Sequence, residues 1–167
     1  HLEKYFQHKV DYAICGEGEQ TLGELLDFSQ RHKDAKELKE INGLALIENG
    51  KITRTSPRKV LKELDTLPYP AWELVDLVKY RELWLKHHGY FSVNLVTTRG
   101  CPFHCNWCAK PVYGQVYNSH SPEYIAGQVK LLKEKYSADH IWFCDDIFGL
   151  KPGWVARYNE IVNGEIV

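Results

Sequence analysis

The sequence predicts an α/β fold in two parts, and three observations support this. A short β-prone run at residues 10–15 leads through glycines into an amphipathic helix. After residue 90, the order strand, loop, helix, strand and helix follows at the spacing of parallel βα units. A proline-rich stretch separates these regions. The expected boundaries are a first domain at 1–56, a linker with a helix at 57–90 and a second domain at 91–167.

The first part is expected to contain a strand, a helix and a hairpin. The strand VDYAIC at 10–15 ends at Gly16. Leucines at helical spacing predict a helix over 19–33. Asn49-Gly50 lies between two arms of alternating apolar residues, which is the strongest short-range signal of a β-hairpin.

The middle part changes in character. Residues 56–70 hold three prolines around a short polar segment, which is typical of an extended linker rather than a packed element. Residues 71–88, AWELVDLVKYRELWLKHH, show helical spacing of apolar side chains.

The second part starts with FSVNLVTT at 91–98, a β-branched run typical of a buried strand. Ser121-Pro122 predicts a helix start, with Ser as N-cap and Pro at the first helical position. Apolar residues at helical spacing then predict one buried helix face. HIWFCDD at 140–146 predicts a second strand and PGWVARYNEIV at 152–162 a second helix.

The composition is that of a globular protein, and it excludes several classes. A net charge of −1 gives no electrostatic reason to expect nucleic acid as a partner. No apolar run approaches the roughly 18 residues of a membrane span, and the first residues do not resemble a secretory leader. We expect a cytoplasmic protein. Because the sequence contains no methionine, we also expect it to be an internal piece of a longer chain.

Three of the five cysteines lie within eight residues, in the pattern Cys-x3-Cys-x2-Cys. Clustered thiols in a chain without a leader indicate a metal site rather than disulfides. Cys101, Cys105 and Cys108 on one loop after a strand can ligate three irons of a [4Fe–4S] cluster and leave the fourth iron open. The isolated Cys15 and Cys144 are expected to be small buried residues.

Two other uses of the three thiols are weaker. A structural zinc ion needs a fourth ligand. The nearest candidate, His104, adjoins Cys105, which strains a tetrahedral arrangement. A ferredoxin-type electron carrier requires a fourth cysteine at different spacing.

The segment VTTRGCPFHCNWCAK resembles the signature of radical S-adenosylmethionine (SAM) enzymes. Trp107 occupies the aromatic position of this signature, and Thr98-Arg99-Gly100 matches the residues that precede it. The resemblance implies that SAM chelates the open iron and is cleaved reductively to a 5′-deoxyadenosyl radical. It also implies a partial (β/α)6 barrel, of which residues 91–167 form the first βα units.

The resemblance extends to two further residues. The end of the second barrel strand helps to bind the SAM amino group in this family, and here that strand ends in Asp145-Asp146. A carboxylate facing an ammonium is a favourable charge-assisted contact, so Asp145 is the candidate. A helix cap or a solvated turn is the structural alternative. Trp107 is expected near the cluster and the SAM adenine.

The segment VDYAICGEGEQTLGELL, followed by the hairpin and LDTLPYPAWEL, is similar to the tail of the cobalamin (B12)-binding domain that precedes many radical SAM barrels. The resemblance places Gly16, Glu17 and Gly18 in the last loop of a Rossmann-like domain, near the nucleotide tail of cobalamin. A glycine-rich turn between a strand and a helix can approach a ligand closely.

Together these resemblances imply an enzyme that uses a [4Fe–4S] cluster, SAM and cobalamin to methylate or rearrange a small-molecule or lipid-like substrate. An electron donor such as flavodoxin or ferredoxin is implied as a partner, and nucleic acid is not. We expect the isolated 167 residues to be inactive, because the later barrel strands are needed to enclose SAM.

Two alternatives differ in class. A tRNA methylthiotransferase would carry a second cysteine triad upstream, where this sequence has Cys15 alone. A non-catalytic module would hold zinc. Metal analysis separates these, because iron with sulfide indicates a cluster and zinc alone a module.

Overall fold

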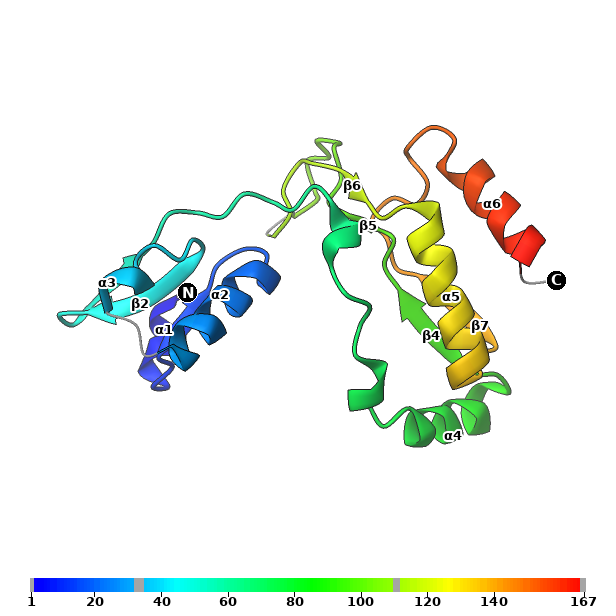
Figure 1. Ribbon diagram of the computed structural model, residues 1–167, viewed down its shortest axis with the longest axis horizontal. Helices are drawn as coiled ribbons and strands as arrows, with labels where there is room; N and C mark the ends of the chain where they lie inside the picture. Colours follow the sequence, from blue (N-terminus) through cyan, green and yellow to red (C-terminus); the bar gives the residue numbers. More distant parts are fainter. Residues whose placement is uncertain (1, 32–34, 110–111, 166–167) are drawn as a thin grey trace. The chain divides into compact units, whose positions relative to one another are not determined.

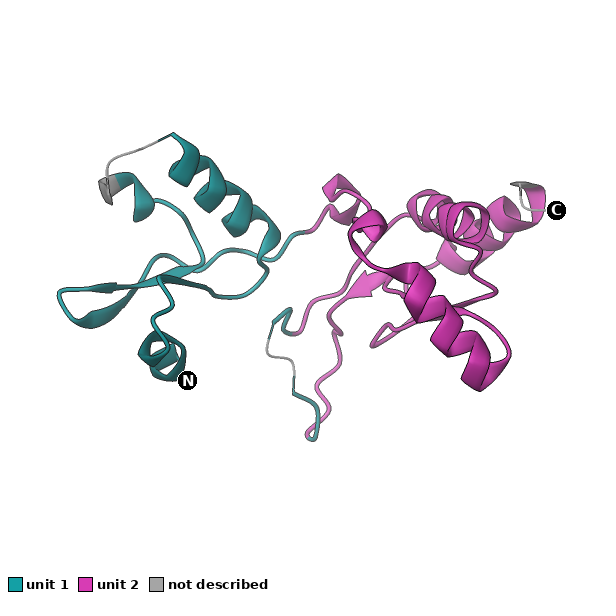
Figure 2. Cartoon of the chain, turned by 90° about the horizontal axis from the view of Figure 1, so that it is seen from below, with its two compact units in different colours: residues 1–61, 107–114 teal, residues 62–106, 115–167 magenta. Residues whose placement is uncertain are grey.

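The computed structural model describes residues 2–31, 35–109 and 112–165 (Figure 1). The chain divides into two compact units (Figure 2). Unit 1 is His1–Leu61 with Trp107–Gly114, and unit 2 is Lys62–Asn106 with Gln115–Val167. Each unit has a hydrophobic core of its own. None of the helices in the described residues is both long and apolar enough to cross a bilayer.

Unit 1 combines a three-stranded antiparallel sheet with helices. The sheet order is β1-β2-β3, and the core is made mainly by Leu38, Ile41, Leu44 and Leu46. The predicted strand, helix and hairpin are all present. The bounds are α1 Leu2–Gln7, β1 Tyr12–Ile14, α2 Glu19–Gln30, α3 Ala35–Leu38, β2 Leu44–Glu48 and β3 Lys51–Arg54.

The hairpin between β2 and β3 has the predicted two-residue turn. Glu48 pairs with Lys51 across it, and Asn49 and Gly50 have φ values of 50° and 75°. Positive φ at both central residues matches the type I′ turn, whose twist suits the two strands. The Asn-Gly signal therefore predicted the correct register.

Gly43, just before β2, is enclosed by three segments of unit 1. Its carbonyl accepts a hydrogen bond from the Cys15 amide at 2.7 Å, and its φ is +78°. An added Cβ would lie 3.0 Å from Thr21 Oγ1 and 3.2 Å from the Cys15 carbonyl oxygen. Gly43 thus needs both its backbone conformation and its lack of a side chain.

We expect Gly43→Ala to lower the free energy of unfolding of unit 1 by about 2 to 4 kcal/mol, from left-handed strain plus overpacking. Gly50→Ala is the matched control, because its φ of +75° is similar but no atom lies within 4 Å of the new Cβ. It should cost about 1 kcal/mol. Urea unfolding followed by circular dichroism measures both, and equal losses would contradict the packing argument.

The predicted proline-rich linker begins in unit 1 and continues into unit 2, where it is packed rather than extended. Leu64 is 1% exposed and lies in the 3₁₀ turn η1, Leu64–Thr66. A second 3₁₀ turn, η2, spans Trp72–Leu74. The predicted helix follows as α4, Leu77–His88, and the Asp76 carboxylate accepts from the Lys79 amide at its start.

The rest of unit 2 is built on a parallel strand pair. β4 Ser92–Leu95 pairs in parallel with β7 His140–Phe143, and α5 Pro122–Tyr136 connects them. The Ser121 hydroxyl caps α5 by accepting from the Tyr124 amide. The predicted βαβ order is therefore confirmed. The remaining elements are β5 Thr98–Arg99, β6 Asn118–Ser119 and α6 Trp154–Glu165.

The core of unit 2 fills the space between this strand pair and its helices. The apolar face predicted for α5 is buried against β4. Because the two strands are parallel, their carboxyl ends meet at one edge of the pair, and both the cysteine loop and Asp145 follow that edge. The fully buried core residues of this cluster include Phe91, Ile125 and Leu132.

Candidate functional site

The cysteine loop leaves the sheet through a short ladder. β5 and β6 pair antiparallel, with Thr98 opposite Ser119 and Arg99 opposite Asn118. Gly100 follows with φ +78°, a conformation that favours glycine, and turns the chain into the loop. The two ends of segment 100–117 therefore lie side by side in unit 2.

The three candidate ligands differ in exposure. Cys101 is buried, 9% exposed, whereas Cys105 and Cys108 are exposed. All five cysteines lie in the described part of the chain, and none of them is in a disulfide. Cys101 and Cys105 belong to unit 2 and Cys108 to unit 1. Within the described residues, no three His, Cys, Asp or Glu side chains form a group that could hold a metal ion, so the convergence of the thiols stays a prediction.

The neighbours of these thiols on the loop are open to solvent. Trp107 is 90% exposed, and its predicted packing near a cluster and the SAM adenine also stays a prediction. His104, the candidate fourth zinc ligand, is exposed as well.

Asp145, the candidate SAM contact, fastens the start of the cysteine loop. Its Oδ1 accepts from the backbone amides of Thr97 at 2.7 Å and Thr98 at 2.9 Å, and its Oδ2 from the Thr97 hydroxyl at 2.5 Å. Both threonines are buried. These three hydrogen bonds, which we call the clasp, are neither the helix cap nor the solvated turn considered as the structural alternative, and a SAM contact stays a prediction.

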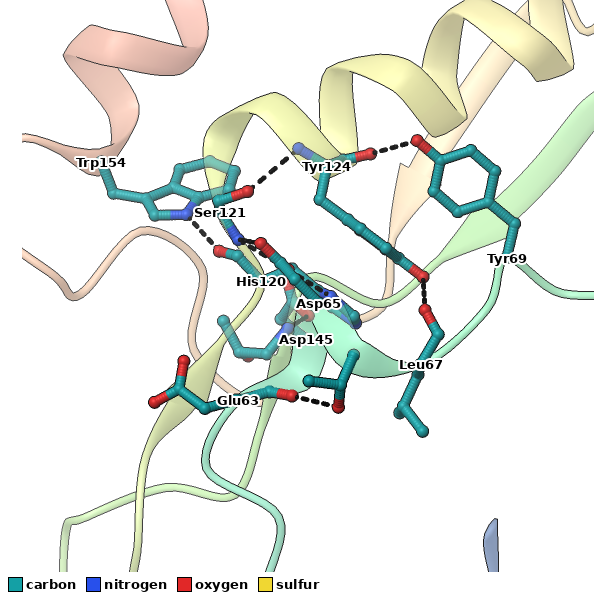
Figure 3. Close-up of polar contacts among 11 residues, drawn as sticks. Glu63, Asp65, Leu67, Tyr69, His120, Ser121, Tyr124, Asp145 and Trp154 are labelled. Carbon is teal, nitrogen blue, oxygen red and sulfur yellow. Dashed lines mark hydrogen bonds and ion pairs between the residues drawn. The ribbon is translucent and has the colours of Figure 1, made fainter. Parts of the chain in front are cut away.

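His120 and Asp65 form a second polar centre beside the loop (Figure 3). His120 is 8% exposed, and its Nδ1 lies 2.9 Å from Asp65 Oδ1. Because a carboxylate only accepts, this contact requires the tautomer with hydrogen on Nδ1. The ring stacks on Tyr124 at 4.2 Å between centroids, and the His120 carbonyl accepts from Trp154 Nε1 at 2.7 Å.

The pKa values of this pair move down for different reasons. Burial lowers the pKa of His120, and the hydrogen bond and charge of Asp65 offset this only in part. Burial raises the pKa of Asp65, but hydrogen bonds from Ser121 and His120 outweigh it, so the net pKa is lowered. Arg99 lowers and Asp145 raises the pKa of His120 through their charges.

The buried His120 leads us to expect that the folded chain loses stability as the pH falls. Because its folded pKa lies below the ordinary value, the unfolded chain takes up the proton first, and stability falls as the pH drops from about 6.5. The lowered pKa of Asp65 contributes stability above its unfolded value, which is lost only at still lower pH. We expect His120→Gln to remove this loss of stability below about pH 6.5, measured as the melting temperature by tryptophan fluorescence. A persisting slope would contradict this, and His87→Gln on exposed α4 is the control.

The glycine-rich loop of unit 1 is held by the segment that follows β3. The Glu17 carboxylate, which is buried, accepts from the Leu61 amide. The Arg58 guanidinium donates to Thr21 Oγ1 at 2.8 Å and Gln20 Oε1 at 3.2 Å, and it pairs with Glu24. Glu17 therefore has a structural role in closing this loop.

A pocket of about 390 Å³ opens beside this loop, within unit 1. Backbone and small side chains form much of its wall, and two arginines contribute positive charge. The sequence-predicted Gly16 lies in this wall, whereas Glu17 and Gly18 do not line it. The lining residues are Cys15, Gly16, Gly43, Leu44, Arg54, Thr55, Pro57 and Arg58.

The two isolated cysteines differ from expectation. Cys15 is half-buried, and Cys144 is exposed. The prediction that Cys144 is buried is wrong, because it follows the last residue of β7, whose positions alternate between exposed and partly covered.

No protein-family model matches the chain. Among curated proteins, the chain is 34% identical over 142 residues to an uncharacterized methyltransferase of Pyrococcus horikoshii, covering 84% of this chain and 29% of that protein. It is 28% identical to an anaerobic magnesium-protoporphyrin IX monomethyl ester cyclase of Synechocystis, over 83% of this chain and 26% of the relative. The chain thus spans less than a third of these relatives.

Solved structures share its architecture. OxsB, a cobalamin-dependent S-adenosylmethionine radical enzyme, matches with a TM-score of 0.72 and 23% identity, over 98% of this chain and 22% of that one. The chain shares the fold of a part of cobalamin-dependent radical SAM enzymes. The radical SAM methyltransferase TsrM from Kitasatospora setae also matches, with a TM-score of 0.65 and 19% identity over 98% of this chain and 30% of that one. The resemblance to radical SAM enzymes of the cobalamin-binding subgroup, predicted from the cysteine loop and the glycine loop, is confirmed.

Sequence reasoning missed three residues of this radical SAM fold. Asp65 and Arg58 lie in the segment interpreted as a linker, and no sequence pattern pairs His120 with Asp65. The helix-start signal at Ser121 was the available clue for Asp65, because a carboxylate is favoured at a helix N-terminus. Sequence spacing gives no sign of which carboxylate fills that place.

Proposed function

We propose that the protein carrying this chain is a radical SAM enzyme in which Cys101, Cys105 and Cys108 ligate a [4Fe–4S] cluster. The observation that supports this proposal most strongly is the Cys-x3-Cys-x2-Cys loop. The loop follows the parallel strand β4 and begins and ends at the β5–β6 ladder. None of the three cysteines is in a disulfide, and thiolates are the usual ligands of such clusters. Three local ligands leave one iron for SAM.

The donor set fits this cofactor better than zinc. The candidate fourth zinc ligand next to the thiols, His104, adjoins Cys105 in sequence and is exposed. When bound and reduced, the cluster supplies the electron that cleaves SAM. This chain would provide the three thiols. Asp145 fixes the start of the loop, and the surrounding residues bury Cys101.

Asp145 is proposed to serve SAM as well as the loop. Asp145 accepts from two amides and a hydroxyl at the strand edge, and a carboxylate there makes a favourable charge-assisted contact with a ligand ammonium. Trp107, exposed on the loop, is available to cover the cluster and the SAM adenine.

We assign residues 1–56 to the end of a cobalamin-binding domain and residues 91–167 to the first units of the SAM barrel, joined by 57–90. The pocket beside Gly16 supports the first assignment, because its volume and the Arg54 side chain in its wall suit part of a large cofactor that carries a phosphate. Glu17 and Gly18 shape the loop around it.

The reaction is proposed to be methylation, or rearrangement, of a small-molecule or lipid-like substrate. Methyl transfer is favoured, because the Pyrococcus horikoshii relative is named a methyltransferase and a Streptomyces wedmorensis relative, 27% identical over 82% of this chain and 30% of its own length, is a cytidylyl-2-hydroxyethylphosphonate methyltransferase. We place the enzyme in the cytoplasm, where thiols stay reduced, with a flavodoxin- or ferredoxin-like electron donor.

Electron paramagnetic resonance of the complete protein, reconstituted anaerobically and reduced, tests this function. We expect a [4Fe–4S]⁺ signal that changes when SAM is added, because SAM occupies the open iron. A protein that binds zinc and gives no such signal would show that the loop is structural.

A further inference from the structure

The base of the cysteine loop is a narrow junction in unit 2. The β5–β6 ladder joins the chain before Gly100 to the chain after Tyr117, and it has two residue pairs. A ladder this short does not hold a loop of eighteen residues by itself, because isolated two-stranded pairs are marginal in water. Other contacts must therefore set its geometry.

Asp145 and a backbone bond hold the β5 side. The carboxylate accepts from Thr97 and Thr98, as described, and the Thr98 hydroxyl donates to the Ile147 carbonyl at 3.2 Å. Directly beyond the ladder, the His120 amide donates to the Thr97 carbonyl at 2.9 Å. The conformation at residue 120 is thus coupled to the strand that leads to Cys101.

Asp65 holds the β6 side from a distant part of the chain (Figure 3). Its Oδ1 accepts hydrogen bonds from His120 Nδ1 at 2.9 Å and from the Ser121 amide at 3.1 Å. Its Oδ2 accepts from the same amide at 3.2 Å. The linker around it is fixed too, because Tyr124 donates its hydroxyl to the Leu67 carbonyl at 2.9 Å.

Helix capping alone does not explain this arrangement. Ser121 already caps α5 through its own hydroxyl, and a capping carboxylate needs no histidine. Burial of the His120 imidazole disfavours its charged form and lowers its pKa, and the Asp65 contact offsets this in part. The Asp65 contact gives this ring a defined orientation at the base of the loop.

We propose that Asp65 and His120 are positioning residues, through which the linker sets the base of the cysteine loop and thereby the placement of its thiols. The pair acts on the loop through Thr97 and Ser121. The effect of the pair on cluster binding rests on the proposed function. Its effect on the β5–β6 ladder does not.

Amide hydrogen exchange by NMR on the cofactor-free chain tests the control of the ladder. In Asp65→Ala we expect the His120 and Ser121 amides and the β5–β6 amides to exchange at least about tenfold faster, as loss of a charged hydrogen-bond partner predicts. Asp76→Ala is the matched control, because it removes a carboxylate that caps a helix of the same unit away from the loop. Ladder amides that keep wild-type rates in Asp65→Ala would overturn the proposal.

A second pair of variants covers the case in which Asp65→Ala does not fold. His120→Asn retains an N–H donor near the position of Nδ1, whereas His120→Ala removes it. We expect wild-type exchange rates in His120→Asn and accelerated rates in His120→Ala. Equal behaviour of the two variants would contradict a role for the contact with Asp65.

The consequence for the cofactor is tested separately, in the complete protein. After anaerobic reconstitution, Asp65→Ala should bind less than about half the iron of the wild type or give an altered resonance spectrum, since its ligands are less ordered. Asp76→Ala should match the wild type. If the reconstituted wild-type protein binds no iron, the proposed function is refuted. The hydrogen-exchange experiment alone then tests whether Asp65 and His120 position the loop.

Discussion

Replacing Cys105 by alanine is expected to lower SAM cleavage by the complete protein at least about a thousandfold, because the cofactor carries the electron-transfer chemistry and two remaining thiols do not hold it. Cys105 is exposed and on the loop, so its removal leaves the cores of both units intact. We expect the melting temperature to stay within about 2 °C of the wild type, as for other surface substitutions.

Cys144→Ala is the matched control for this variant. Cys144 is also an exposed, reduced cysteine of unit 2, but it lies after β7 and outside the Cys-x3-Cys-x2-Cys pattern. It should keep full iron content and activity. Iron and acid-labile sulfide, with release of methionine from SAM, are the measurements, and a Cys105→Ala protein with a normal cluster would refute the assigned ligand.

Asp145→Ala is expected to lower the free energy of unfolding of unit 2 by about 3 to 5 kcal/mol, because two buried amides and one hydroxyl lose their acceptor at once. The amides belong to Thr97 and Thr98, which lie in the interior of the unit at the start of the cysteine loop. Urea unfolding followed by tryptophan fluorescence measures this loss.

The neighbouring carboxylate provides the control. Asp146 is exposed, and Asp146→Ala should change the stability by no more than about 0.5 kcal/mol. Similar effects of the two variants would contradict the clasp.

Asp145→Asn separates the clasp from the proposed SAM contact. The amide oxygen still accepts from both backbone amides, and the Thr97 hydroxyl can reverse to accept from the new NH₂ group. Stability should fall by about 1 kcal/mol, while SAM binding weakens about tenfold if the charge faces the SAM ammonium. Unchanged SAM affinity in Asp145→Asn would leave Asp145 as a structural residue of the loop.

The elements that sequence patterns predicted correctly are local ones. Asn49-Gly50 fixed the hairpin register, and Ser121-Pro122 marked the start of α5, because turn and cap preferences depend on neighbouring residues alone. The strand order after residue 90 followed from alternating elements, and the parallel pairing of β4 and β7 confirmed it.

The differences arise where a side chain meets a distant part of the chain. The proline-rich segment was predicted to be extended, but Leu64 is buried and Asp65 reaches a histidine 55 positions away. Cys144 was predicted to be buried from its apolar neighbours, and its position at the strand end exposes it. Composition within a short window carries no information on such contacts.

The sequence by itself predicted the class of the protein and its candidate ligands, because that prediction depends on the chemistry and spacing of three thiols within eight residues. The tertiary structure alone decided what holds that loop. Asp65, His120 and Asp145 are far apart in sequence and act on Thr97, Thr98 and Ser121 through hydrogen bonds. Which of these distant residues pair is decided by burial and by the geometry that folding creates.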